Sequence, residues 1–256
     1  MMKNYAVLLC IIFSFACSFQ GYPTPCFRSP ALSSTKNDIA DFEYGEMRAV
    51  LDAMEKENVP SRDLAAPDRA LVESYVRKVV SERPSAIPVK DIARVLPGSK
   101  WRLGFSTEGA TLGDLPKDAE VQLEFCDKTR MDYILQFSKK TAGLDRLVAK
   151  SSYTVDSTSI NPGLVTFVYD QIVTDVFGLK NIGVGFFGLL KGKTNYVESQ
   201  YMDNRYWIER GYSPEGAEYY NVYVRQFEPG SQAEEDAEQG GDQRYPSGST
   251  IDDQWD

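Results

Sequence analysis

The stretch VQLEFCDKTRMDYILQF, residues 121–137, decides the fold class of this chain. In its first part apolar residues alternate with Gln122 and Glu124, and after the turn-forming residues 127–130 they return at every second position from 131 to 137. A period of two is typical of a β-strand with one buried face. The stretch therefore predicts a β-hairpin with Gln122 and Glu124 on its polar face.

The same period continues on both sides of this hairpin. Trp101, Leu103 and Phe105 alternate with polar or small residues, which predicts that all three share one face. Further strands are predicted at residues 147–155, 164–176, 195–202, 206–209 and 219–226, separated by turns rich in Gly, Pro and Asn. Many short strands favour an antiparallel sheet, and closing the sheet removes its exposed edges. We therefore expect a mainly β protein with an antiparallel β-barrel of about eight strands, which is wide enough to be filled by side chains or to hold one small apolar ligand.

Helical patterns precede the strands. Apolar residues of 37–54 and of 68–82 recur at spacings of three and four, which is typical of helices that bury one face. A short helical turn is predicted at 89–96. We therefore divide the body into an N-terminal helical region, residues 37–98, and a barrel, residues 99–227.

The beginning of the chain has the composition of a targeting presequence rather than of a folded domain. Residues 1–18 combine a basic start, a short apolar core and small residues at the end, as a signal peptide does. Residues 19–36 begin with Phe19 and carry basic and hydroxyl residues without an acid, as a transit segment does. This order resembles the bipartite presequence of algae whose plastids lie inside an ER-derived membrane. We expect import into the plastid through the ER, to the stroma or the thylakoid; the alternative is a secreted protein.

The opposite end of the chain is strongly acidic. The formal net charge of the whole chain is −9, and residues 228–256 carry nine acidic residues against the single basic residue Arg244, a net charge of −8. This segment has too few large apolar groups to offset the entropy of ordering it, so we expect a disordered, solvating tail. The alternative is a tail that binds a basic partner.

Composition also limits the chemistry. The chain has no histidine, which excludes imidazole bases and His-ligated zinc. Once the presequence is removed, only Cys126 remains of the four cysteines, and we interpret it as a structural thiol on a strand. The body of the chain has no cluster of Lys and Arg, so we do not expect it to bind nucleic acid. We expect no catalytic residue, metal or cofactor; the enzymatic alternative would use the carboxylates of Asp170, Asp175 and Glu124.

Two runs of residues carry a resemblance to a known family. Residues 98–107, GSKWRLGFST, and residues 201–211, YMDNRYWIERG, are similar to the first barrel strand and to the C-terminal signature of the plastid lipid-associated proteins, or plastid fibrillins. An aromatic strand that ends at Arg225 follows, as in the family. Trp207 departs from the pattern, because the family has an arginine there. The matching motif residues are Tyr201, Asp203, Ile208, Arg210 and Gly211.

The resemblance implies a lipocalin-like, non-catalytic protein at thylakoids or plastid lipid droplets (plastoglobules), with an apolar lipid, quinone or carotenoid as its partner. Such ligands bind through large apolar contacts, so the aromatic residues of the strands are the candidate binding residues. They are Trp101, Phe105, Phe125, Tyr133, Phe137 and Phe167. The alternative is that these side chains fill the barrel and that the protein assembles or binds a photosynthetic complex through its outer face.

Residues 177–193 form a Gly-, Phe- and Leu-rich segment flanked by lysines. Its uncharged part is too short to span a bilayer, but it suits insertion into a lipid interface. The candidate membrane contacts are Phe186, Phe187, Leu189, Leu190 and Lys191. The alternative is a buried strand or helix beneath the barrel.

Overall fold

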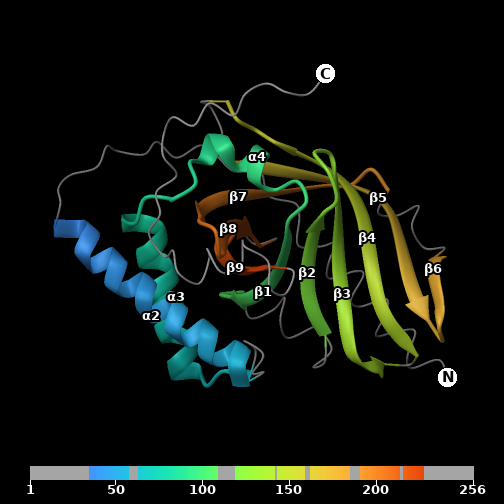
Figure 1. Ribbon diagram of the computed structural model, residues 1–256, viewed down its shortest axis with the longest axis horizontal. Coiled ribbons are helices and arrows are strands. Elements are labelled where there is room, and N and C mark those ends of the chain that lie inside the picture. The colour runs from blue at the N-terminus through green and yellow to red at the C-terminus, as the bar shows by residue number, and fades with distance from the viewer. Residues whose placement is uncertain are drawn as a thin grey trace.

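A computed structural model describes residues 35–57, 63–108, 119–141, 143–158, 162–184, 191–213 and 216–227. Two helices lie against one face of a strongly curved antiparallel sheet (Figure 1). The predicted presequence and the predicted acidic tail lie outside the described residues, apart from the last two positions of the transit segment, which begin the first helix.

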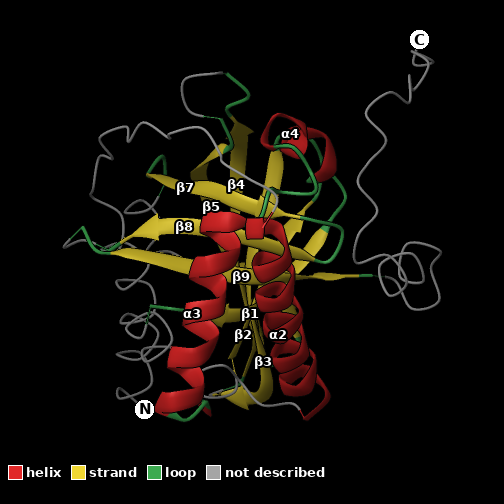
Figure 2. Ribbon diagram, turned by 90° about the vertical axis from the view of Figure 1, so that its left-hand side faces the viewer, coloured by secondary structure: helices red, strands yellow, loops and turns green. Residues whose placement is uncertain are grey.

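The helices follow the predicted apolar spacing. Helix α2 (Thr35–Glu57) is followed by α3 (Ala66–Glu82), which has Pro67 in its first turn, where a missing N–H costs nothing. The short helices η2 (Val89–Asp91) and α4 (Ile92–Val95) come next. Figure 2 shows α2 and α3 side by side across the strands behind them.

Within the described residues, nine strands form the sheet, and eight of them close into a ring. The ring order is β4-β3-β2-β1-β9-β8-β7-β5, and β5 pairs back with β4. Strand β6 pairs with the C-terminal part of β5, residues 173–176. It was not predicted as a separate strand, because it lies in the segment that we assigned to lipid contact. The strands are β1 (Lys100–Ser106), β2 (Ala119–Phe125), β3 (Arg130–Thr141), β4 (Leu144–Val155), β5 (Leu164–Val176), β6 (Leu179–Gly183), β7 (Thr194–Met202), β8 (Tyr206–Tyr212) and β9 (Glu218–Gln226).

The ring has two different ends. At one end, here called the capped end, residues 87–98 pack onto the interior: Ile87 donates its N–H to the carbonyl of Met202 at 2.9 Å, and Gly98 donates to Phe125 at 2.7 Å. At the other end, here called the hairpin end, the β5–β6 turn meets the turn between β3 and β4, where the N–H of Phe177 donates to the carbonyl of Gly143 at 2.9 Å. The capped end is thus closed by packed side chains of residues 87–98.

The two long helices cover the outer face of β7, β8, β9 and β1. One buried cluster joins helix residues such as Met47 and Val76 to the outward side chains of these strands. Phe105 belongs to this cluster, and the guanidinium of Arg69 lies 5.6 Å from its ring centroid. The prediction that Phe105 shares a face with Trp101 and Leu103 is therefore wrong.

A bulge in β1 explains this correction. The pairing of β1 with β9 shifts register between Leu103 and Phe105, so the alternation of faces breaks at Gly104. A Cβ at Gly104 would lie 2.9 Å from a Val224 methyl group, and Leu51 of α2 lies 3.7 Å away. Glycine at this position allows the helix to approach the bulged strand.

The β7–β8 turn fixes the helices to the ring. The carboxylate of Asp203 accepts hydrogen bonds from the hydroxyls of Tyr44 (2.7 Å) and Tyr201 (2.8 Å), and from the backbone N–H groups of Arg205 (2.7 Å) and Tyr206 (2.6 Å). Burial and the Asp203 carboxylate raise the pKa of Tyr44 and of Tyr201 far above the ordinary value, so both stay protonated donors. The motif residues Tyr201 and Asp203 thus dock helix α2.

Candidate functional site in the interior of the strand ring

Aromatic side chains fill the ring toward its capped end. Trp101, Phe125 and Trp207 are fully buried. The rings of Trp101 and Trp207 pack edge to face, with their centroids 5.8 Å apart. Their indole N–H groups donate to the hydroxyls of Ser99 (2.7 Å) and Ser199 (3.0 Å). Phe167 and residues of the cap complete this cluster. The predicted ligand contacts Trp101, Phe125 and Phe167 therefore lie inside the ring and serve as packed core.

A second apolar cluster lies nearer the hairpin end. It contains Val121, Leu135, Phe137, Leu147, Tyr169 and Ile172. Leu103 and Tyr133 contact both clusters, yet both remain only partly buried. Val121 and Leu135 face the same way from neighbouring positions and are 3% and 1% exposed. Side chains that fill a core lose nearly all their accessible surface, so Leu103 and Tyr133 differ in this respect from the buried residues beside them.

A buried carboxyl group lies in this part of the ring. Glu209 of β8 is 3% exposed and pairs across the sheet with Asn221 of β9. Its Oε1 accepts hydrogen bonds from Asn221 Nδ2 at 2.8 Å and from the hydroxyl of Tyr223 at 3.2 Å. Burial raises the pKa of Glu209 from 4.5 to about 7, and the two hydrogen bonds oppose that rise. The group therefore changes protonation state near neutral pH.

Tyrosines from three strands surround Glu209. Tyr133, Tyr169 and Tyr219 are all close enough for the carboxylate to raise their pKa values, although burial is the largest cause for each. Since β3 and β8 are not neighbours in the ring, the effect on Tyr133 acts across the interior. Asn195 hydrogen-bonds to Tyr169 and limits the rise of its pKa to about 12. The arrangement is a set of neutral hydroxyl and amide groups around one acid.

Gly211 has a defined role in this set. A Cβ at this position would lie 2.3 Å from Cζ of Tyr219, so the tyrosine ring lies flat over the glycine on the neighbouring strand. Any larger side chain would displace Tyr219 from the interior. Of the other motif residues, Ile208 packs under the helices, and Arg210 on the outer face forms ion pairs with Glu198 and with Glu218.

The sequence prediction missed the polar part of this site. Tyr133 and Phe137 were predicted to face the interior and do so, but Glu209, Asn221, Tyr219 and Tyr223 were not singled out. A signal for them exists in the alternation of β8 and β9: Glu209 shares its face with Trp207 and Gly211, and Asn221 shares its face with two tyrosines. A polar residue between buried aromatic residues on the same face predicts a buried polar group.

The acids considered for an enzyme lie elsewhere. Glu124 on the outer face pairs with Lys100 at 3.3 Å, and Asp175 pairs with Arg146 at 2.7 Å and accepts the N–H of Asn181. Asp170 is exposed at a bulge of β5. Because each acid lies in a different surrounding, the three do not form a joint acid–base site.

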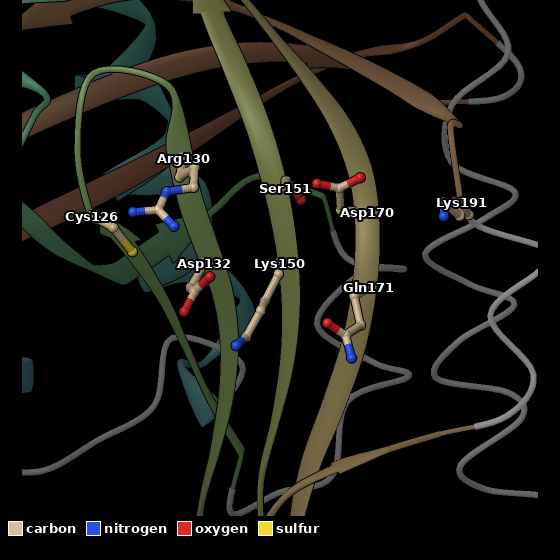
Figure 3. A pocket seen from close by; sticks show the side chains of 8 residues that line it. All are labelled: Cys126, Arg130, Asp132, Lys150, Ser151, Asp170, Gln171 and Lys191. Atoms are coloured by element: carbon tan, nitrogen blue, oxygen red, sulfur yellow. The ribbon is translucent and has the colours of Figure 1, made fainter.

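Asp170 lines a polar pocket on the outer face of β3, β4 and β5. Figure 3 shows the side chains of these strands that line it, together with Cys126 just after β2 and Lys191 just before β7. The strand residues are Arg130, Asp132, Lys150, Ser151, Asp170 and Gln171. Cys126 is exposed just after β2 rather than packed within a strand, which corrects its interpretation as a structural thiol. Partial burial and neighbouring carboxylates raise the pKa of its thiol, which lowers the thiolate fraction that a nucleophile needs. The raised pKa therefore disfavours Cys126 as a nucleophile.

The hairpin end carries exposed apolar residues. Phe177, Leu179 and Ile182 of the β5–β6 hairpin are all exposed, Phe177 to 77%. Among the predicted membrane contacts, Lys191 is exposed, while Phe186, Phe187, Leu189 and Leu190 lie outside the described residues. Within the described part of the chain, no helix has the length and apolar character required to cross a membrane. Compared with protein-family models and with curated proteins, the sequence matches none.

Proposed function

We propose that this protein is a non-catalytic lipid-binding protein of the plastid fibrillin type. In this proposal the ring is a lipocalin-like barrel that takes an apolar lipid, quinone or carotenoid into its interior. The two sequence motifs and the bipartite presequence support the family and the compartment. The structure adds the coarse architecture to this support: two long helices precede an antiparallel sheet whose strands form a ring.

The observation that carries the proposal is the accessible surface of two inward side chains that contact both interior clusters. Leu103 and Tyr133 keep accessible surface, although Val121, Leu123 and Leu135 beside them are buried. An apolar ligand that enters at the hairpin end would contact these residues and Phe137, and would gain about 25 cal/mol for each Å² of apolar surface that it buries.

The hairpin end also supports contact with a lipid surface. Phe177, Leu179 and Ile182 lie close to Lys180 in the sequence, and Lys191 follows on the same connection. Apolar residues can enter the boundary between headgroups and acyl chains while lysines meet anionic headgroups. The proposed membrane contact is therefore peripheral, and it places the mouth of the ring next to the source of the ligand.

Purification of the full chain from plastid-bearing cells tests this function. We expect a neutral lipid, quinone or carotenoid to be extracted from the purified protein by organic solvent and identified by mass spectrometry. We also expect the protein to float with vesicles of thylakoid lipids in a density gradient. A protein that carries no such molecule and stays away from the vesicles would contradict the proposal and favour the alternative, an assembly protein with a filled ring.

A further inference from the structure

The interior polar group has a specific chemical character. The described groups that act on the carboxyl of Glu209 are the amide of Asn221 and the hydroxyl of Tyr223, and no lysine or arginine is among them. A bound carboxylate or phosphate would therefore meet a buried acid without a compensating cation, and burial of two like charges together is strongly unfavourable. The interior is unsuited to anionic lipids.

The amide of Asn221, which contacts Glu209, has one hydrogen-bond acceptor without a partner. Both hydrogen bonds to Glu209 end on Oε1, and the Nδ2 of Asn221 supplies one of them. The Oδ1 of Asn221 is buried and has no hydrogen-bond partner. A buried acceptor without a partner costs free energy, which a donor from a ligand would recover. The chemistry required of the ligand is therefore a neutral group that donates.

The residue that carries this acceptor belongs to the same inward set as the side chains that keep accessible surface. Asn221 is only partly buried as a residue, like Leu103 and Tyr133, and all three are inward positions. Around them lie apolar side chains and tyrosines that suit a hydrocarbon chain or ring. A ligand could thus place its apolar part toward the hairpin end and its polar group at β8 and β9.

We propose that Glu209 and Asn221 form a polar anchor for the hydroxyl group of a neutral lipid inside the ring. This proposal rests on the proposed lipid-binding function and adds the class of ligand: a lipid alcohol, phenol or quinol rather than a fatty acid, a phospholipid or a plain hydrocarbon. The hydroxyl donates to Asn221 Oδ1 and meets the carboxyl of Glu209, which accepts when ionised and can donate when protonated.

Ligand competition tests the anchor. The full chain is loaded with the uncharged fluorescent dye N-phenylnaphthylamine, which is then displaced by a long-chain primary alcohol, by the alkane and by the carboxylate of the same chain length, at about pH 8, where Glu209 is mostly ionised. We expect the alcohol to bind at least about tenfold more tightly than either of the others, because only the alcohol satisfies the unpaired acceptor without adding charge.

Two variants and one control assign the preference to these residues. Glu209→Gln should raise the affinity for the carboxylate about tenfold or more, because it removes the like charge, and Asn221→Leu should lower the affinity for the alcohol about tenfold. Glu120→Gln, on the exposed outer face of β2, should change neither affinity. Circular dichroism establishes that each variant is folded.

The outcomes separate the two proposals. If the wild-type chain binds the dye and lipids but ranks the three ligands equally, or if Glu209→Gln leaves the ranking unchanged, the anchor is overturned while lipid binding stands. If the chain binds neither dye nor any ligand, both proposals fail. The wild-type ranking decides the matter even if a variant does not fold.

Discussion

Glu209 is destabilising for the fold when it is ionised. The ordinary pKa of a glutamate side chain is 4.5, and burial raises the pKa of Glu209 to about 7 in the folded chain. The folded state therefore binds the proton more tightly than the unfolded state between these values. By linkage, the contribution of this residue to stability is fully present below pH 4.5 and is lost as the pH rises through 7. The ionised carboxyl group therefore lowers the stability of the fold at neutral and higher pH.

We therefore expect Glu209→Gln to stabilise the protein in a pH-dependent manner. At about pH 8.5 the free energy of unfolding should rise by about 3 kcal/mol at most, the equivalent of the raised pKa, and at about pH 4.5 the difference should nearly vanish. Urea unfolding of both proteins at these two pH values measures the difference. Glu120→Gln should show no such dependence. An effect of Glu209→Gln that is equal at both pH values would contradict the assigned protonation behaviour.

The β5–β6 hairpin has a turn residue that local backbone preferences do not explain. Phe177 has φ 52° and Gly178 has φ 80°, so both turn positions are left-handed, as in a two-residue type I′ turn. Asn or Gly is favoured at the first position, and a bulky aromatic residue there is unusual. The Phe177 ring lies over Gly143, where a Cβ would be 2.3 Å from Cε1. An exposed aromatic residue held in this conformation fits the proposed lipid contact.

Phe177→Asn should have opposite effects on stability and on membrane binding. Asparagine tolerates the left-handed conformation, so the free energy of unfolding should rise by about 0.5–1 kcal/mol. Flotation with thylakoid-lipid vesicles should weaken roughly tenfold, because an apolar side chain at the interface is lost. Tyr196→Asn, another exposed aromatic position, serves as the control and should leave flotation unchanged. Unaltered flotation of Phe177→Asn would show that this hairpin does not meet the lipid surface.

At the scale of the whole molecule, the proposed function joins a lipid-binding ring to a predicted presequence. An apolar core such as that of residues 1–18 directs a chain only to the ER, so in this proposal the signal for the plastid lies in the segment that begins at Phe19. The proposed function depends on this second step, because it supplies the thylakoid lipids among which the ring would select.

A fluorescent fusion of residues 1–36 should therefore enter the plastid of an alga with an ER-enclosed plastid. Phe19→Ala should divert the fusion to the ER or the medium, since the apolar core is left intact while the new N-terminus changes. Microscopy with a plastid marker distinguishes these locations. A wild-type fusion found in the medium, or a Phe19→Ala fusion that still reaches the plastid, would remove the support that the presequence lends to the plastid assignment.

For the whole molecule, local sequence patterns determined the fold class, and tertiary structure determined which side chains meet. The helical spacing of 37–54 and 68–82 and the alternation of 121–137 depend on near neighbours in the chain, so the sequence by itself determined a mainly β protein with two leading helices and antiparallel strands. It also identified Tyr133 as an inward aromatic residue, because its strand is regular.

Only the tertiary structure decided which side chains meet. The bulge at Gly104 moves Phe105 to the helix-covered face. A Glu within a strand is normally interpreted as solvent-exposed, so the alternation of β8 alone could not establish that Glu209 is buried. Closure of the ring depends on the pairing of β4 with β5 and of β1 with β9, and the second pair joins strands more than a hundred residues apart. Burial and pKa arise from these distant contacts, because the electrostatic environment of a group is set by the atoms around it in space and not by its neighbours along the chain.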